Sequence, residues 1–462
     1  MDESRELGRE NVWKLLVKFS IPAVIGMLVN ALYSVVDRIF VGRGVGSMAL
    51  SGVAVTFPIT NIIMAVGMLV GTGAAAVVSI KLGQKKLGEA EHILGNAFVL
   101  SVGITIIISI LGLVFLEPLL VMFGASAETL PYARQFAAIL LSGAVLQNIG
   151  FGLNPIIRSQ GDPKTAMKTM LIGAVLNFAI NPVLIFGFNL GVAGSAFATL
   201  ISQAVCTVWI FTYFTRGKSL LKLKKPNLKL EKHIVGQILA IGISPFAMQV
   251  AASLVTISIN TNLYRYGGDL AIGAYSLISS IAILLLMPMF GINQGAQPII
   301  GYNYGSMQHD RVKKALKYSA GVNTVIAAAG FLIIELFPVQ IISMFNSTDK
   351  QLIAIGSEGI RLYLMMMVLI GPSCAIINYF QSVGKAKQSM VLSLLRQVIL
   401  LIPLVFILPH FFQLHGIWMA GAVSDLVSSL ICFAFIAKEA KLLNGTDEKI
   451  RENLAAACNV QS

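Results

Sequence analysis

An acidic residue near the start of the chain, Asp37, lies inside a stretch otherwise apolar enough to cross a membrane. An ionisable group in lipid is costly and therefore indicates a function. Asn30, Tyr33 and Asp37 are spaced i, i+3 and i+7, so on a helix they form one polar stripe that could attract a cation. Pro22 removes a backbone donor from the same helix and loosens it. The alternative is that Asp37 and Arg38 merely mark the point where the helix reaches the membrane interface.

A second group of polar side chains lies further along the first half. Asn177 and Asn181 are one helical turn apart, and the proline after them leaves a backbone carbonyl without its usual donor. Thr199 adds a hydroxyl and Asn154 an amide beside another proline. A carboxylate with neutral amide, hydroxyl and carbonyl oxygens suits Na⁺, or a proton held on the carboxylate. The expected ion-coupling site therefore comprises Asp37, Asn177, Asn181 and Thr199. For each amide or hydroxyl alone, interhelical hydrogen bonding is the alternative.

Sequence patterns typical of enzymes are missing. The five histidines show no metal-ligand cluster, there is no GxxxxGK[ST] phosphate loop, and no GxSxG nucleophile precedes a suitable base. The four cysteines show no paired spacing, and the three in predicted helices are expected to be packing residues. We predict a protein that is not an enzyme and that has no cofactor, with H⁺ or Na⁺ as coupling ion.

The composition indicates an all-α, polytopic membrane protein. Of its 462 residues 56% are hydrophobic and 12% charged, and the mean hydropathy is +0.80. Apolar runs long enough to cross a bilayer recur along the chain. The twelve predicted spans are 13–41, 49–79, 93–117, 132–158, 165–187, 192–214, 233–264, 271–301, 315–340, 353–383, 388–411 and 416–438. No cleaved signal peptide is expected.

The net charge of +13 is explained by its distribution along the chain, without nucleic acid. With the N-terminus on the cytoplasmic side, nineteen Lys and Arg residues fall in inner loops, Arg158 among them, and four in outer loops. By the positive-inside rule, both termini are expected in the cytoplasm. We expect a multi-pass protein of the inner (plasma) membrane, with lipids as its surroundings, that functions as a monomer.

Two copies of one unit can be aligned at an offset of about 222 residues, which we call the repeat offset. Gly46 then lies on Gly268, and Gly83 on Gly305. Each half holds six predicted helices, so both copies have the same orientation, related by a pseudo-two-fold axis along the membrane normal. The predicted divisions are an N-lobe (1–215), a basic cytoplasmic linker (216–233), a C-lobe (234–440) and a cytoplasmic tail (441–462). The linker is expected to be solvated and to lie along the anionic inner surface.

The second half has different polar residues, because Ile259 stands at the repeat offset from Asp37. Its most deeply placed opposite charges are Arg396 and Asp425, on neighbouring antiparallel helices. An unpaired charge is expensive in a low-dielectric interior, so we predict that they form a buried pair. Such a pair would be a structural pin, or Asp425 could exchange its partner for a proton or a cationic solute. The methionines 287, 289 and 365–367 could provide an adaptable wall for flat ligands, or simply face lipid.

The chain resembles the multidrug and toxic compound extrusion (MATE) family, in particular its bacterial DinF-type branch. The resemblance rests on Ile21-Pro22, on Val36 to Gly42, on Asn177-xxx-Asn181-Pro182 and on Gly191 to Gly194. It implies a V-shaped pair of six-helix lobes that exports organic, often cationic, compounds in exchange for H⁺ or Na⁺. It also implies that Pro22 is the bending proline of the first helix. Some members have aspartate in place of Asn181, and Ser253 and Ile370 stand near the C-lobe acids that another branch uses.

The sequence therefore predicts a secondary active antiporter that exports drug-like, cationic or amphipathic compounds by alternating access. The first alternative is a flippase for lipid-linked precursors, which would be expected to line its cleft with several arginines. Only Arg396 is expected to lie deep. The second alternative is a membrane-embedded lipid enzyme, which would need a nucleophile or a metal set.

Overall fold

A computed structural model describes residues 3–345 and 349–459, and within these ranges all regular structure is helical. The strongly apolar spans have no other way to satisfy their backbone groups in lipid, apart from a closed barrel. The helices of the first half are α1 (Glu3–Arg9), α2 (Val12–Gly44), α3 (Ser47–Val55), α4 (Phe57–Gly83), α5 (Leu87–Val114), α6 (Leu116–Met122), α7 (Leu130–Ser142), α8 (Ala144–Ser159), α9 (Pro163–Pro182), the π-helical η1 (Val183–Gly187) and α10 (Gly191–Thr215). The linker contains the 3₁₀ turn η2 (Lys225–Leu228). The second half comprises α11 (Lys232–Gly305), α12 (His309–Leu336), α13 (Pro338–Ser343), α14 (Lys350–Leu364), α15 (Met367–Ser382), α16 (Ala386–Leu394), the π-helical η3 (Leu395–Leu401), α17 (Ile402–Ile407) and α18 (Pro409–Asn459).

The number of membrane crossings agrees with the twelve predicted spans. In the described part of the chain, nine helices are long and apolar enough to cross, and two bent pairs, α7 with α8 and α14 with α15, raise this to eleven. Helix α11 contributes two crossings, because its 74 residues include Gly268 in a non-helical conformation. A straight helix of that length would measure about 110 Å, several times the thickness of a bilayer.

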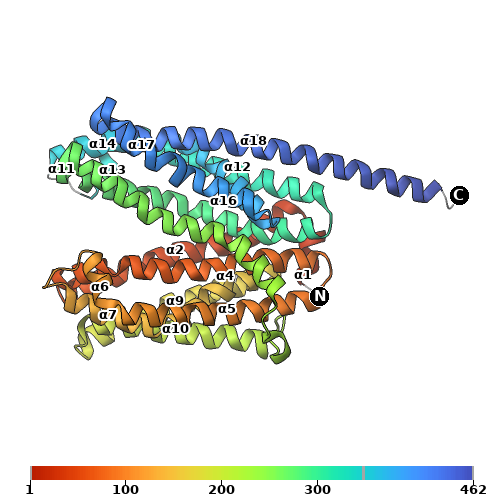
Figure 1. Cartoon of the computed structure of the whole chain (residues 1–462), viewed down its shortest axis with the longest axis horizontal. Coiled ribbons are helices and arrows are strands. Elements are labelled where there is room, and N and C mark those ends of the chain that lie inside the picture. The colour runs from red at the N-terminus through yellow and green to blue at the C-terminus, as the bar shows by residue number, and fades with distance from the viewer. Residues whose placement is uncertain (1–2, 346–348, 460–462) are drawn as a thin grey trace.

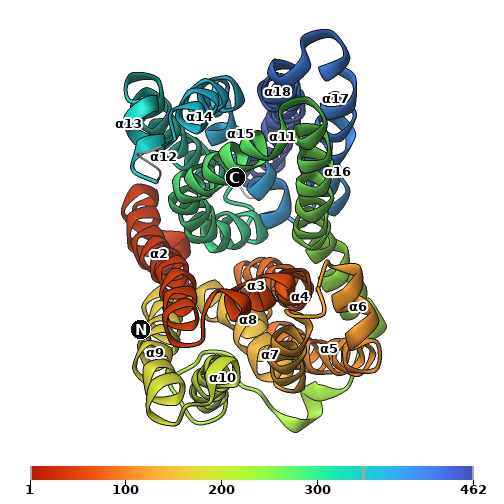
Figure 2. The same cartoon turned by 90° about the vertical axis from the view of Figure 1, so that its left-hand side faces the viewer.

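The helices form two lobes that lie side by side (Figures 1 and 2). Helices α2 to α10 make up the N-lobe and α11 to α18 the C-lobe. The largest hydrophobic core runs across both lobes and includes Leu15, Val70, Ile238 and Ile300. Separate smaller cores lie within each lobe. The predicted architecture of two six-helix lobes is therefore confirmed.

The backbone itself carries the predicted repeat. Residues with positive φ occur at equivalent places of the two halves, separated by the repeat offset or by one or two positions more. The pairs are Gly46 and Gly268, Lys85 and Met307, Gly161 and Gly384, and Asn189 and Gln413. Lys85 and Met307 each follow a long helix directly, so both halves turn their chain in the same way at the same end.

A close contact between the lobes obeys the same symmetry. A Cβ atom at Gly83 of α4 would lie 2.0 Å from the carbonyl oxygen of Tyr302, and one at Gly305 of α11 would lie 2.1 Å from that of Ile80. Tyr302 and Ile80 are themselves separated by the repeat offset. We call this contact the glycine seam. Small residues allow two helix backbones to approach this closely.

The linker differs from the expected solvated segment. Ser219, Leu221 and Asn227 are buried against the N-lobe, while Lys224 pairs with Glu91 of α5 at 2.7 Å. The linker therefore forms a strap along α5, because its few apolar and amide side chains find partners there. Its lysines 224, 225 and 229 remain exposed.

The C-terminal segment continues as helix. Helix α18 extends to Asn459 and projects beyond the bundle (Figure 1), so most of the predicted tail 441–462 prolongs the last span. Residues 460–462, and residues 1–2 of the predicted N-lobe, lie outside the described residues.

Candidate functional site

Helix α2 presents the predicted polar stripe to the interior of the N-lobe. Asn11 caps the helix by accepting hydrogen bonds from the backbone N–H groups of Trp13 and Lys14. The helix then continues through the buried Pro22 to Gly44 as a single element. Over this length, residues three and four apart share one face, which brings Tyr33 and Asp37 opposite α9 and α10.

Helices α9 and α10 supply the other members of the predicted site. Asn177 and Asn181 lie one turn apart on α9 and are 2% and 0% exposed. Pro182 directly afterwards ends the regular helix, which widens into the π-helical turn η1. On α10, the fully buried Ser195 and, one turn later, Thr199 face the same region.

One chain of hydrogen bonds joins these side chains. Asn181 Nδ2 donates to Asp37 Oδ1 at 2.5 Å and to Asn177 Oδ1 at 3.3 Å. Asn177 Nδ2 donates to Thr199 Oγ1 at 3.2 Å, and Thr199 Oγ1 lies 3.0 Å from Tyr33 Oη. The structure thus brings together all four predicted coupling residues and Tyr33.

Ser195 also belongs to the site, although the sequence analysis did not identify it. Its Oγ donates to Asp37 Oδ1 at 2.7 Å. In the sequence this serine stands in the small-residue run GVAGSA, where packing explains it equally well. Its position one turn before Thr199 on the same helix is the only signal that could have revealed it.

One oxygen of this network has no partner. Asn181 Oδ1 is buried and accepts no hydrogen bond within the described residues. A buried acceptor without a donor is costly in a native structure, so this oxygen is available to a proton donor or an ion. Together with the Asp37 carboxylate and the neighbouring amide and hydroxyl oxygens, it forms a donor set suited to Na⁺ or to a proton.

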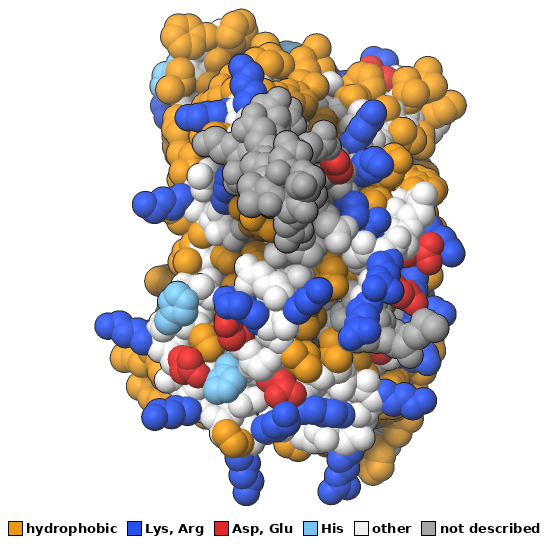
Figure 3. All heavy atoms as spheres, turned by 90° about the vertical axis from the view of Figure 1, so that its right-hand side faces the viewer, with side chains coloured by type: hydrophobic (Ala, Val, Ile, Leu, Met, Phe, Trp, Pro, Cys, Tyr) orange, Lys and Arg blue, Asp and Glu red, His pale blue; other side chains and the backbone are white. Residues whose placement is uncertain are grey.

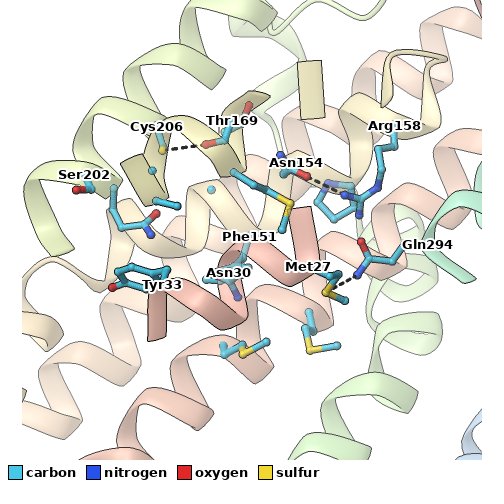
Figure 4. Close-up of a pocket in the computed structure, with 18 of the residues that line it drawn as sticks. Met27, Asn30, Tyr33, Phe151, Asn154, Arg158, Thr169, Ser202, Cys206 and Gln294 are labelled. Carbon is cyan, nitrogen blue, oxygen red and sulfur yellow. Dashed lines mark hydrogen bonds between the residues drawn. The ribbon is translucent and has the colours of Figure 1, made fainter. Parts of the chain in front are cut away.

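The network borders a chamber of about 180 Å³ within the N-lobe. Figure 4 shows Tyr33 and Ser202 toward one end and Arg158 with Gln294 toward the other, with Asn30 and Asn154 between them. Its apolar wall contains Phe151 and the methionines 27, 64, 68 and 170, and Gln294 and Gln297 of α11 reach it from the C-lobe. The lining methionines are therefore not the predicted ones, since Met289 and Met367 are buried in the C-lobe core. A run of methionines in the sequence could not reveal this, because the methionines that line the chamber come from three separate helices, α2, α4 and α9.

The inner arginine Arg158 corrects two expectations. It was assigned to a loop, and Arg396 was expected to be the only deep arginine, yet Arg158 is 6% exposed and lines the chamber. Its Nη1 donates to Asn154 Oδ1 at 2.9 Å, and Asn154 Nδ2 donates to the carbonyl of Ala166. Asn154 therefore orients Arg158 and does not join the Asp37 network. An arginine at the end of an apolar run is normally taken as interfacial, which explains the error.

The predicted charges of the C-lobe also meet. Arg396 Nε lies 2.5 Å from Asp425 Oδ1, and the two side chains are 31% and 4% exposed. Arg396 stands in the π-helical η3, and Ser424 Oγ donates to its carbonyl at 2.6 Å. This pair borders a second, smaller cavity.

Two pseudo-symmetric lobes of six membrane-crossing helices, with a chamber inside the N-lobe, are typical of a polytopic membrane transporter of alternating-access design. Residues 22–183 and 245–407 match the MatE family, one block in each lobe, and the chain belongs to this family. Members of the family are transporters, so the chain is a multidrug-type efflux transporter and not an enzyme. The flippase alternative is not favoured.

Several known proteins are similar over nearly the whole length. The multidrug export protein MepA of Staphylococcus haemolyticus is 27% identical over 428 residues, covering 92% of either chain. MepA of Staphylococcus aureus is 26% identical over 434 residues, covering 92% of this chain and 93% of that one. A solved structure of the MATE multidrug transporter DinF-BH is 38% identical, with a TM-score of 0.87 and coverage of 93% and 96%. A MATE structure in the bent conformation is 25% identical, with a TM-score of 0.91 and coverage of 96% and 99%.

Proposed function

We propose that this chain exports organic, cationic or amphipathic compounds in exchange for H⁺ or Na⁺, and that Asp37 is the coupling carboxylate. The observation that supports this most directly is the continuous hydrogen-bond chain from Asp37 through Asn181, Asn177 and Thr199 to Tyr33. Tyr33, Asn177 and Thr199 also line the chamber. A change at the carboxylate can therefore reach the surface that a solute would touch.

Charge on Asp37 determines which arrangement of this network is stable. The ionised carboxylate accepts from both Asn181 and Ser195 through one oxygen. A proton on Asp37 would weaken both of these hydrogen bonds. The protonated carboxyl could then donate a hydrogen bond to Asn181 Oδ1, which has no partner among the described residues. Na⁺ would instead draw the amide oxygens of Asn181 and Asn177 toward itself. Either event rearranges the amides, and through Thr199 the position of Tyr33 in the chamber.

Charge distribution supports a cytoplasmic location for both termini. Lysines and arginines crowd the end of the molecule from which the C-terminal helix projects (Figure 3), and the exposed lysines of the strap belong to the loops counted there. By the positive-inside rule this end faces the cytoplasm of the cell that carries the protein in its plasma membrane. Because one chain provides both lobes and the chamber, we propose that it functions as a monomer in lipid.

Reconstitution into liposomes tests the proposal. Efflux of a panel of fluorescent dye cations would be measured with a pH gradient or a Na⁺ gradient imposed separately. The wild-type protein should respond to one gradient or both, whereas Asp37→Asn should lose gradient-driven efflux while reconstituting normally. Asp269→Asn, an exposed acid between the two spans of α11, is the matched control and should behave as wild type. Normal ion dependence of Asp37→Asn would place coupling elsewhere, with Asp425 as the next candidate.

A further inference from the structure

The C-lobe contains a space of about 100 Å³ that the proposed coupling mechanism does not use. It lies between α11, α15, α16, η3 and α18, and we call it the C-lobe cavity. Phe290, Cys374 and Leu392 form part of its wall, and Arg396 and Asp425 are its charged members.

This cavity is the repeat counterpart of the N-lobe chamber. Leu286 and Phe290 stand at the repeat offset from Met64 and Met68 of the chamber wall. Helices α8 and α15 both have 16 residues and align one position beyond that offset, as do Gly161 and Gly384 directly after them. In this register the cavity residues Cys374, Ser393, Arg396 and Gln397 take the places of the chamber residues Phe151, Met170, Gly173 and Ala174.

The last helix of each lobe completes the correspondence. Helix α18 supplies Asp425 to the C-lobe cavity, whereas α10 supplies only neutral side chains to the chamber, such as Thr199 and Gln203. The fold therefore builds a hollow in each lobe. In the C-lobe cavity two neighbouring helical segments, η3 and α18, carry an ion pair. Their counterparts in the N-lobe, α9 and α10, provide only uncharged side chains to the chamber.

The guanidinium group of Arg396 uses only part of its hydrogen-bonding capacity in the ion pair. Arg396 contacts Asp425 through Nε alone, and neither of its Nη groups makes a hydrogen bond within residues 3–345 and 349–459. A guanidinium group carries five N–H donors in a planar fork, so the four N–H groups on its two Nη atoms remain for another acceptor. Next to it, Gln397 Oε1 is buried without a partner among the described residues, and the two ends of this amide can exchange places by a simple flip.

We propose that the C-lobe cavity binds a small carboxylate, free or as the end group of a solute, on the open Nη side of Arg396. Arginine and carboxylate match in a planar, bidentate geometry. An anion can bind there without breaking the existing pair, because the contact to Asp425 uses Nε. A cation would first have to displace Arg396 from Asp425, whose side chain is only 4% exposed. The volume admits a carboxylate with a short apolar stub and excludes a whole drug molecule.

The π-helical turn η3 places the guanidinium at this position. In an ordinary α-helix each residue advances the side-chain direction by a fixed angle, and a π-helical turn changes this register. Arg396 and Gln397 are the second and third residues of η3 and both line the cavity. Such turns occur frequently at functional sites, and in the N-lobe η1 directly follows the proposed coupling residues.

Acetate binding to the purified full-length protein in detergent tests the proposal without any transport. Saturation-transfer NMR on the acetate methyl group would report binding, and the thermal midpoint would be followed with sodium acetate, sodium chloride or methylammonium sulfate added. We expect acetate to bind and to raise the midpoint. The double variant Arg396→Gln/Asp425→Asn removes both charges and strands neither, and should bind acetate roughly tenfold more weakly or worse, since hydrogen bonds to a charged group are lost.

Two further variants make the result unambiguous. Arg158→Gln removes the other buried arginine, and acetate binding should persist. Cys374→Phe introduces the residue that the N-lobe has at the corresponding position, Phe151, and should fill the cavity and weaken acetate binding with both charges kept. If the double variant does not fold, Cys374→Phe therefore still tests whether acetate binds in the C-lobe cavity. Unchanged binding in the double variant or in Cys374→Phe, loss of binding in Arg158→Gln, or protection by methylammonium in place of acetate would each overturn the proposal.

Discussion

Alanine in place of Gly83 or Gly305 should force the lobes apart at the basic end of the molecule. The added methyl carbon would lie 2.0 Å from the Tyr302 carbonyl oxygen or 2.1 Å from that of Ile80, and such contacts essentially never fall below 3.0 Å. The helices must therefore separate by about 1.0 Å (3.0 − 2.0). Both neighbours are backbone atoms, so no side-chain rotation relieves the contact. Overpacking of this kind costs about 1–3 kcal/mol, which corresponds to roughly a 5–150-fold shift between two states that differ in this contact.

Spin-label distances between the lobes would measure the effect. Cysteines replacing Gly88 at the start of α5 and Lys314 near the start of α12, both exposed, would carry the labels in a chain without its native cysteines. Either alanine substitution should move the distance distribution to longer values, and the two should act alike because the repeat relates them. Gradient-driven efflux should fall, because the state closed at this end becomes less populated.

Gly103→Ala and Gly321→Ala are the matched controls, one in each lobe. Both are helical glycines at which an added Cβ would meet nothing within 4 Å beyond the backbone of its own helix, so neither should change the distances. If Gly83→Ala and Gly305→Ala gave the same distances and efflux as these controls, the glycine seam would not be the contact that closes this end.

Four other substitutions have defined outcomes. Arg396→Leu strands the buried carboxylate of Asp425 and should lower the free energy of unfolding by about 3–5 kcal/mol. Asp425→Leu strands the partly exposed guanidinium of Arg396 and should cost less, and the double variant should lose less than Arg396→Leu; strictly additive losses in detergent thermal denaturation would contradict this. Ser195→Ala removes a charge-assisted bond to Asp37 and should shift the ion dependence of efflux by roughly tenfold or more; an unchanged titration of efflux against pH or Na⁺ would speak against it. Thr199→Val breaks the link between Asn177 and Tyr33 and should weaken coupling less than Asp37→Asn, as the ratio of driven to undriven efflux would show.

The fold could be predicted because the sequence patterns that specify it are either local or repeated in the two halves of the chain. An apolar run long enough to cross a bilayer specifies a helix by itself, and the repeat offset connects distant positions without any contact being known. Even unusual backbone conformations follow the repeat, as Gly46 and Gly268 show. The strap was missed for the opposite reason: the burial of Leu221 depends on a groove that only the assembled N-lobe provides.

The site could be predicted where residue type alone is informative. A carboxylate in a span is rare, so Asp37 could be recognised from its residue type, and the two amides at Asn177 and Asn181 share a helix face directly before Pro182. Ser195 and Arg158 could not be found in this way, since a serine among small residues and an arginine near a helix end have ordinary explanations. Ser195 is distinguished by its hydrogen bond to Asp37, and Arg158 by its burial. Both features depend on how separate helices pack together.

The strap also restricts how the two halves of the molecule can move. Near its end it is fixed to α5, where the Glu231 backbone N–H donates to Asn96 Oδ1 at 2.8 Å, and α11 begins with the next residue. The covalent tether between the lobes therefore has almost no slack and acts as a pivot beside α5. When one lobe rotates relative to the other, residues close to this pivot are displaced little and remote residues are displaced most. We therefore expect the lobes to rotate about Glu231, because a straight separation of the lobes would first have to break the contacts between the strap and the N-lobe.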